Sequence, residues 1–165
     1  MKIVLFLLIA LWHLDGSELE IAKKACAKND IKSCYKVAVI LTTGKNKENQ
    51  EKNKLGIDYM RKACIYGEIN ACDDLGKNYY NEKSYIAARP YLHSSCLRGD
   101  KNACEQIGTI YRDGHDVRTN DVKARFYYEK ACELGNEDAC INVALMYRGG
   151  FGVDINRTLE KKYYQ

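Results

Sequence analysis

Apolar and small residues recur along this chain with the spacing of amphipathic α-helices. In three segments they fall at positions i, i+3, i+4 and i+7, which form one face of a helix. These faces are Gly56, Tyr59, Met60 and Ala63; Ala88, Tyr91, Leu92 and Ser95; and Ala124, Tyr127, Tyr128 and Ala131. Most of the residues between them are polar. The pattern predicts a helix that ends shortly after each face.

A second amphipathic segment follows each of these helices, and a similar segment occurs earlier in the chain. Their faces are Val37, Ala38 and Leu41; Leu75, Gly76 and Tyr79; Ile107, Gly108 and Tyr111; and Val143, Ala144 and Tyr147. Glycine and alanine occupy matched sites on both kinds of segment, so we expect paired helices to approach closely, with tyrosines filling the space between successive pairs. The chain is therefore predicted to be all-α and to consist of αα-hairpins.

Eight cysteines form pairs with the same internal spacing of eight residues. The pairs are Cys26 and Cys34, Cys64 and Cys72, Cys96 and Cys104, and Cys132 and Cys140. Eight residues span about 12 Å on one helix and about 26 Å on one strand, whereas a disulfide needs Cα atoms within about 7 Å of each other. If the pairs are bonded, the chain must reverse between them. Asn29, Gly67, Gly99 and Gly135, three residues after the first cysteines, favour the left-handed conformation that ends a helix.

The cysteine pairs also reveal an internal repeat. The first cysteines of successive pairs are 38, 32 and 36 residues apart, in the range typical of solenoids of paired helices. We predict a single repeat domain over 17–165, with repeats at about 18–44, 52–82, 84–114 and 121–150 and a C-terminal capping helix at 156–165. Pro90, the only proline, lies six residues before Cys96 inside an expected helix and predicts a kink or a late helix start.

Eight cysteines permit many connectivities, and the periodicity favours pairing within each repeat. Metal binding is the alternative for these thiols. Zinc sites use Cys-x-x-Cys pairs or histidine partners, but the spacing here is different and only His93 and His115 lie beyond residue 16. We predict four disulfides, no metal site and no cofactor.

The N-terminus has the features of a secretory signal peptide. Lys2 precedes an apolar run from Ile3 to Trp12, which is too short to span a bilayer. We predict a signal peptide over 1–16, cleaved near Gly16 or Ser17, and a secreted or periplasmic protein with no membrane anchor. Export agrees with the paired cysteines, because disulfides persist in oxidising compartments.

The charge of the chain argues against nucleic-acid binding. The net charge is +4, and it does not change when Lys2 and Asp15 are removed with the predicted signal peptide. Basic and acidic residues are interspersed, so we expect no basic stripe and no nucleic-acid partner.

The recurring pattern of an aromatic residue, Lys-Ala-Cys, Gly, Ala-Cys and a tyrosine-containing second helix resembles the Sel-one-like repeat, a relative of the tetratricopeptide repeat. Its clearest copy runs from Phe126 to Cys140. Paired cysteines in each unit and a signal peptide resemble the Helicobacter cysteine-rich protein family, over Glu18 to Gln165. This resemblance implies a secreted or periplasmic right-handed superhelical solenoid of αα-hairpins, each stapled by its own disulfide. It also implies a penicillin-binding protein with weak β-lactamase activity.

The residues themselves contain no recognisable β-lactamase machinery. One Ser-x-x-Lys match runs from Ser33 to Lys36, but neither a Ser-Asp-Asn nor a Lys-Thr-Gly sequence accompanies it. In the other repeats alanine takes the place of Ser33: Ala71, Ala103 and Ala139. We interpret Ser33 as a small packing residue and assign no catalytic residue, so which residues would be catalytic is unknown and the enzyme hypothesis rests on resemblance alone. A zinc β-lactamase is excluded because the chain has no His-x-His-x-Asp cluster.

The alternative function is a non-catalytic binding scaffold. Solenoids present an extended groove lined by equivalent positions of successive repeats. Tyr80, Arg112 and Arg148 lie near the ends of the second helices, and the arginines are candidates to hold carboxylates. The predicted partners are a β-lactam or peptidoglycan fragment, or an extracellular protein. Cations at helix C-termini also simply favour the helix dipole, which is a competing interpretation of both arginines.

Overall fold

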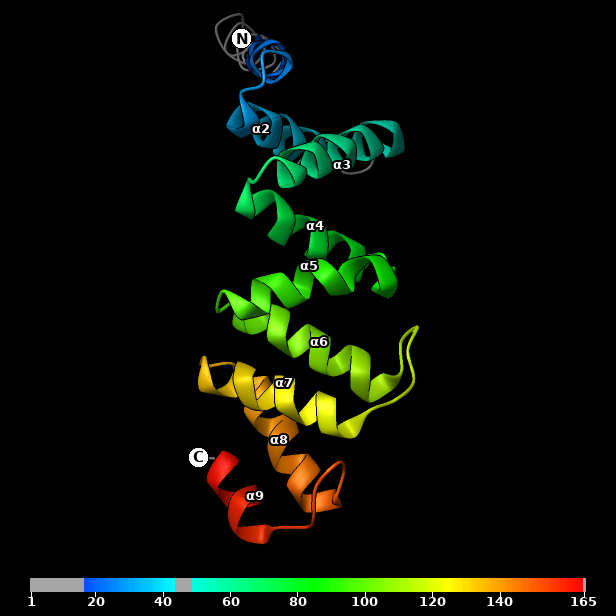
Figure 1. Ribbon diagram of the computed structural model, residues 1–165, viewed down its shortest axis with the longest axis vertical. Helices are drawn as coiled ribbons and strands as arrows, with labels where there is room; N and C mark the ends of the chain where they lie inside the picture. Colours follow the sequence, from blue (N-terminus) through cyan, green and yellow to red (C-terminus); the bar gives the residue numbers. More distant parts are fainter. Residues whose placement is uncertain (1–16, 44–48, 165) are drawn as a thin grey trace, which may run out of the picture. The chain divides into compact units, whose positions relative to one another are not determined.

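All regular secondary structure in the described part of the chain is helical (Figure 1). The computed structural model describes residues 17–43 and 49–164. A helical segment over 17–27 is followed by α2 (Ile31–Thr42), α3 (Gln50–Ile65), α4 (Ile69–Asn81), α5 (Tyr85–Leu97), α6 (Lys101–Asp113), α7 (Asp121–Glu133), α8 (Glu137–Gly149) and α9 (Arg157–Tyr163). The predicted signal peptide over 1–16 lies outside the described residues. Among those described, no helix is both long and apolar enough to cross a membrane.

Short polar residues begin most of these helices. The side chains of Asn49, Asp100, Asn120, Asn136 and Asn156 accept hydrogen bonds from backbone N–H groups in the first turns of α3, α6, α7, α8 and α9. Such caps satisfy N–H groups that have no partner within the helix. The loops between helices therefore specify where each following helix starts.

The turn within each hairpin adopts the left-handed conformation that the sequence predicts. Asn29, Gly67, Gly99 and Gly135 have φ values of 65°, 95°, 95° and 85°. The residue that follows each of them donates its N–H back to the preceding helix, as Asp30 does to the carbonyl of Ala25 at 3.1 Å. Each reversal thus closes one helix and leads directly into its partner.

All four predicted disulfides are present, each between consecutive helices of one hairpin. The bonds Cys26–Cys34, Cys64–Cys72, Cys96–Cys104 and Cys132–Cys140 have Cα–Cα distances of 4.6 to 4.7 Å. No free cysteine occurs among the described residues, nor do these residues contain a cluster of potential metal ligands. The prediction of local pairing is confirmed.

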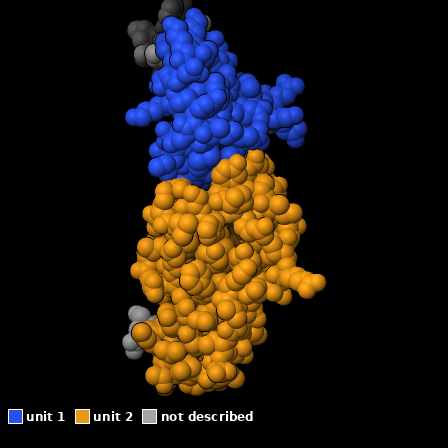
Figure 2. Space-filling view, viewed as in Figure 1, with its two compact units in different colours: residues 1–75 blue, residues 76–165 orange. Residues whose placement is uncertain are grey.

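The chain divides into two compact units, Met1–Leu75 and Gly76–Gln165 (Figure 2). In the first unit, Ala22, Val37 and Leu41 form a buried cluster. A Cβ atom added at Gly56 would lie 2.6 Å from Cγ2 of Thr42, so the glycine allows α3 to lie directly on α2. The close approach predicted from small residues is confirmed here.

In the second unit, tyrosines pack between one hairpin and the next. The rings of Tyr111 and Tyr127 stack at 5.9 Å, and those of Tyr147 and Tyr163 stack at 5.8 Å. In each pair a residue near the end of a second helix meets a residue of the following helix. The predicted packing role of these tyrosines is confirmed.

Pro90 lies inside α5 and does not delay its start. The helix begins at Tyr85, eleven residues before Cys96, just as α7 begins at Asp121, eleven residues before Cys132. The alternative of a late helix start was therefore wrong. Proline lacks an N–H and cannot donate to the carbonyl of Ile86. Pro90 and Ile86 both lie on the exposed side of α5, so the carbonyl of Ile86, which lacks this helix hydrogen bond, does not face the core.

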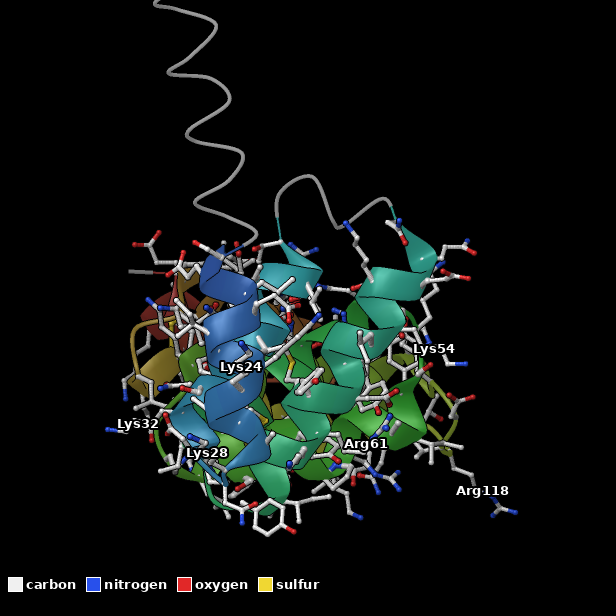
Figure 3. The ribbon with its side chains drawn as sticks, turned by 90° about the horizontal axis from the view of Figure 1, so that it is seen from above. Lys24, Lys28, Lys32, Lys54, Arg61 and Arg118 are labelled. Carbon is white, nitrogen blue, oxygen red and sulfur yellow. A yellow bond between two sulfur atoms is a disulfide. The ribbon has the colours of Figure 1, made fainter. Side chains whose placement is uncertain are left out.

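Exposed basic side chains are dispersed over several elements (Figure 3). Lys24 and Lys28 belong to the first helix pair, Lys54 and Arg61 to α3, and Arg118 to the loop after α6. The dispersal agrees with the interspersed charges of the sequence. The expectation that nucleic acid is not a partner stays a prediction.

Candidate ligand-binding site

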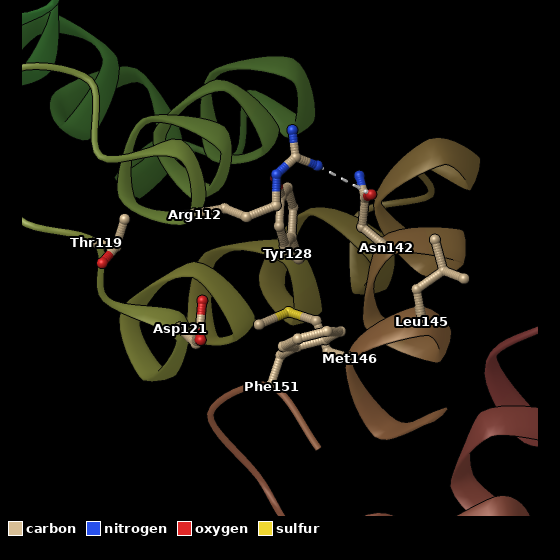
Figure 4. Close-up of a pocket in the computed structure, with 8 residues that line it drawn as sticks. All are labelled: Arg112, Thr119, Asp121, Tyr128, Asn142, Leu145, Met146 and Phe151. Carbon is tan, nitrogen blue, oxygen red and sulfur yellow. Dashed lines mark hydrogen bonds between the residues drawn. The ribbon is translucent and has the colours of Figure 1, made fainter. Parts of the chain in front are cut away.

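A cavity of about 450 Å³ opens between α6, α7 and α8 in the second unit (Figure 4). Its lining residues are Arg112, Thr119, Asp121, Tyr128, Asn142, Leu145, Met146 and Phe151. Arg112 and Asn142 lie on one side, whereas Met146 and Phe151 lie on the other (Figure 4). The volume is in the range of small-molecule and side-chain pockets.

Two left-handed glycines bring these residues together. Gly114 ends α6 with φ 70°, and the chain then passes Thr119 before Asn120 caps α7. Gly150 ends α8 with φ 73° and turns the chain so that the ring of Phe151 lies over Gly149. A Cβ atom at Gly149 would overlap that ring, so the Gly149-Gly150 pair is needed to place Phe151 at the cavity.

Arg112 is held by an acidic neighbour rather than left open to a ligand. Its Nε and Nη2 atoms donate to the two carboxylate oxygens of Asp113 at 2.7 and 3.0 Å, and Nη1 donates to Oδ1 of Asn142 at 3.3 Å. The Asp113 carboxylate raises the pKa of Arg112, and the guanidinium in turn lowers the pKa of Asp113. Asp121 adds a second carboxylate to the rim. The site therefore offers hydrogen-bonding groups with little excess positive charge.

A partly buried hydrogen-bond network extends from this cavity toward α4. Tyr128 is fully buried and lies with its hydroxyl 3.0 Å from Oγ1 of Thr109, which donates to Glu105 at 2.9 Å. Burial, reinforced by the Glu105 carboxylate, raises the pKa of Tyr80 to about 12. Tyr80 also interacts with Thr109 and Tyr128. The phenol groups are thus neutral hydrogen-bonding groups at physiological pH.

Two of the three binding residues predicted from the sequence lie at this cavity or in its hydrogen-bond network, and the third lies outside both. Arg112 lines the cavity, and Tyr80 reaches the same network through Thr109 and Tyr128. Arg148 is exposed in the last turn of α8 and does not line this cavity. Sequence reasoning missed Asn142 and Phe151. Asn142 lies two residues after the second cysteine of its repeat, a position that presents a polar residue in every repeat, and this was the available signal.

Ser33 and Lys36, the two ends of the Ser-x-x-Lys match, both form contacts with nearby acidic side chains. Both residues line another cavity, of about 430 Å³, in the first unit. Ser33 Oγ donates to Oδ2 of Asp30 at 2.5 Å, and Lys36 Nζ forms an ion pair with Glu18 at 2.7 Å. The hydrogen bond from Ser33 is the main cause of a lowered pKa for Asp30, which makes this carboxylate a weaker proton acceptor. These contacts favour a structural interpretation of both side chains.

Comparisons with known proteins agree with this architecture. The Sel1 repeat family model matches residues 31–65, 101–136 and 137–165. Helicobacter pylori cysteine rich protein B is 31% identical with a TM-score of 0.50, covering 67% of this chain and 81% of that one. A comparison with curated proteins gives no match.

Two further solved structures are similar over most of the chain. One is c5321, a protective antigen of uropathogenic Escherichia coli with an SLR fold, at 22% identity and a TM-score of 0.68. The other is a Sel1 repeat protein from Oxalobacter formigenes, at 21% identity and a TM-score of 0.69. Each alignment covers 88% of this chain, which spans 32% and 60% of the respective structures. These similarities confirm the predicted all-α fold of hairpin repeats.

Proposed function

This chain belongs to the Sel1 repeat family, and from that premise we propose that it is a disulfide-stapled scaffold that binds a peptide segment of another protein. The observation that carries the proposal is the cavity between α6, α7 and α8. It combines an exposed aromatic ring, Phe151, with the amide of Asn142 and the guanidinium of Arg112. Pockets of this composition bind ligands through an apolar group oriented by a few polar contacts.

The chemistry of the rim favours a neutral, amphipathic ligand. Because Asp113 already occupies two N–H groups of Arg112, a ligand carboxylate would compete with an existing salt bridge. The amide of Asn142 offers both a donor and an acceptor, which matches the N–H and C=O groups of an extended peptide. Leu145 and Phe151 remain exposed by 36% and 55%, so an apolar side chain entering the cavity would cover them.

A random peptide library displayed on phage tests the proposal on the oxidised protein. We expect enriched peptides to share a large apolar residue, because such a residue fills the cavity beside Phe151. Phe151→Ala should weaken binding of those peptides about 10-fold or more, and Asn142→Ala about 3- to 10-fold. The matched control is Phe126→Ala, since Phe126 is exposed to a similar degree but lies outside this cavity.

The proposal is contradicted if no peptide is enriched. It is also contradicted if the enriched peptides bind wild type, Phe151→Ala and Asn142→Ala with the same affinity. Melting temperatures within a few degrees of wild type establish that both variants are folded. We expect an unchanged melting temperature for Phe151→Ala, because Phe151 is exposed.

Slow β-lactam hydrolysis is the alternative that the resemblance to the Helicobacter family implies. It needs a nucleophile, a base and an oxyanion hole. Ser33 is instead bound to Asp30, and Lys36 is ion-paired with Glu18. The binding scaffold is therefore the better-supported function. Hydrolysis of a chromogenic cephalosporin can be measured on the same preparations. We expect that any turnover by the wild type is unchanged in Ser33→Ala.

We also infer that the protein folds in an oxidising compartment and is secreted or periplasmic. The support for this inference is the set of four disulfides, each within its own hairpin. Thiols in reducing compartments rarely form such structural bonds.

A further inference from the structure

A second cavity, of about 420 Å³, lies between α5, α6 and α7 and shares no lining residue with the first. Its lining residues are Ile86, Arg89, Pro90, His93, Ile107, Tyr111 and Tyr127. The basic groups come from α5 and the tyrosines from α6 and α7. Among the residues that the structure describes, none that lines this cavity is acidic.

Arg89 contributes a guanidinium group to the lining of this cavity. Its side chain is half-buried, and within residues 17–43 and 49–164 it forms no salt bridge. The helix that carries it has no acidic residue between Tyr85 and Leu97. A partly desolvated guanidinium without a counter-ion is costly, and an incoming anion removes that cost.

The acidic residues of α7 point away from the cavity. Asp121 lines the peptide cavity described above. Glu129 accepts two hydrogen bonds from Arg125 at 2.8 and 2.9 Å and one from Tyr147 of α8 at 3.1 Å, so it faces α8 rather than this cavity. Glu133 is exposed and acts electrostatically on Tyr163 of α9. None of these carboxylates is therefore placed to neutralise Arg89.

The acidic residues of α6 are likewise engaged elsewhere. Glu105 accepts a hydrogen bond from Thr109 in the network that leads to Tyr80. Asp113 holds Arg112. Of the two arginines that line these two cavities, Arg112 is thus neutralised by its neighbour, whereas Arg89 is not.

Aromatic rings line the cavity beside Arg89, and a second cation lies close to one of these rings. Tyr111 and Tyr127 stack with an interplanar angle of 8° and form an aromatic wall, and His93 meets Tyr127 edge-on at 6.2 Å. Lys123 Nζ of α7 lies 5.1 Å from the centroid of the Tyr111 ring, which is one of the two rings of this wall. Positive charge and apolar surface therefore occur next to each other.

We propose that this cavity binds a small anionic ligand, whose carboxylate or phosphate is held by Arg89 and whose planar apolar part packs against Tyr111 and Tyr127. Arg89 supplies a planar fork that matches either oxyanion, and Lys123 adds a second positive charge. Pro90 and Ile86 cover the apolar part from α5. This site is independent of the peptide cavity.

Titration of the oxidised protein with phenylacetate and with phenyl phosphate, followed by amide chemical shifts in NMR, tests the proposal. The two probes separate a carboxylate from a phosphate ligand, and benzyl alcohol is the neutral control. We expect saturable shifts in α5 and α7 with at least one anion, weaker binding as salt increases, and none with benzyl alcohol. Arg89→Gln should weaken binding at least 10-fold, whereas Arg148→Gln, at an exposed site outside both cavities, should not change it.

Lys123→Gln is the second test variant, because Lys123 is exposed and its replacement leaves the core intact. It should weaken binding about 2- to 5-fold even if Arg89→Gln does not fold. The proposal is overturned if neither anion causes saturable shifts, if benzyl alcohol binds equally well, or if binding is unchanged in Lys123→Gln and in folded Arg89→Gln. Loss of anion binding in Arg148→Gln would also overturn it.

Discussion

Single glycines control how closely neighbouring helices of this repeat protein approach. Gly108 of α6 is the clearest case, because Tyr128 of α7 packs directly on it and is fully buried. An added Cβ atom would lie 2.7 Å from Cδ1 and 2.8 Å from Cε1 of that ring. The ring cannot move aside without disturbing its hydroxyl, which is hydrogen-bonded to Thr109 at 3.0 Å. Helix spacing at this point thus depends on one missing methyl group.

Gly108→Ala should destabilise the protein by about 1–2 kcal/mol. Overpacking costs about 1–3 kcal/mol, and the better helix propensity of alanine returns up to about 1 kcal/mol. Urea unfolding measures the change. Val122→Ala, at an exposed position on α7, is the control and should change the free energy of unfolding by less than about 0.5 kcal/mol. A variant as stable as wild type would show that α6 and α7 are not in close contact at Gly108.

Helix starts combine a cap with a charge, and α6 illustrates both. Asp100 accepts hydrogen bonds from the N–H groups of Asn102 and Ala103 at 2.9 and 3.1 Å, and it forms an ion pair with Lys77 at 3.1 Å. Burial raises the pKa of Asp100, but these hydrogen bonds and the lysine outweigh burial, so that the pKa lies below the ordinary value of 3.8. The start of α6 is therefore stabilised by a charged carboxylate.

Asp100→Asn tests this contribution, because asparagine retains the cap and removes the charge. A carboxylate whose pKa is lowered by folding adds stability above pH 3.8, and this stability is lost as the pH falls through the lower native value. We expect the variant to be about 0.5–1 kcal/mol less stable at pH 7, and we expect this difference to shrink as the pH falls below 3.8 toward pH 2. Urea unfolding at both values measures the difference. A deficit that persists at pH 2 would assign the effect to the cap rather than to the charge.

The molecule as a whole gains its stability from stapled hairpins as well as from its core. Buried clusters lie within each compact unit rather than at one common centre, as in other repeat proteins. Each disulfide closes a short loop between the two helices of one hairpin. In the chain-entropy account each loop contributes about 2.5 kcal/mol, so the bonds together contribute about 10 kcal/mol. Typical domains have about 5–15 kcal/mol in total.

Reduction should therefore unfold most of the protein at room temperature. Far-UV circular dichroism before and after treatment with a phosphine reductant measures the loss of helix. An unreduced peptide digest should show only the four links within hairpins. Retention of the full helical signal with all thiols free would show that the core alone suffices, and any link between different hairpins would contradict the repeat architecture.

Much of the fold could be predicted from the sequence because it depends on local geometry. The spacing of Cys64 and Cys72 requires a reversal, and Gly67 between them supplies it with φ 95°. Tyr111 and Tyr127 recur at matched positions, and their stacking follows from the repeat. These features involve residues that are neighbours in sequence or equivalent in adjacent hairpins, so periodicity was sufficient to find them.

The binding surfaces were not predictable in this way, because they depend on the direction of side chains that meet from different helices. The sequence places Arg112 and Arg148 at matched sites, but tertiary packing puts Arg112 in a cavity and pairs it with Asp113, while Arg148 lies outside. No pattern in the sequence marked Arg89 as a binding residue. It became a candidate anion site only when the folded helices turned every carboxylate of α6 and α7 away from it. The ion pairing of a side chain depends on distances in space, which a pattern along the chain does not contain.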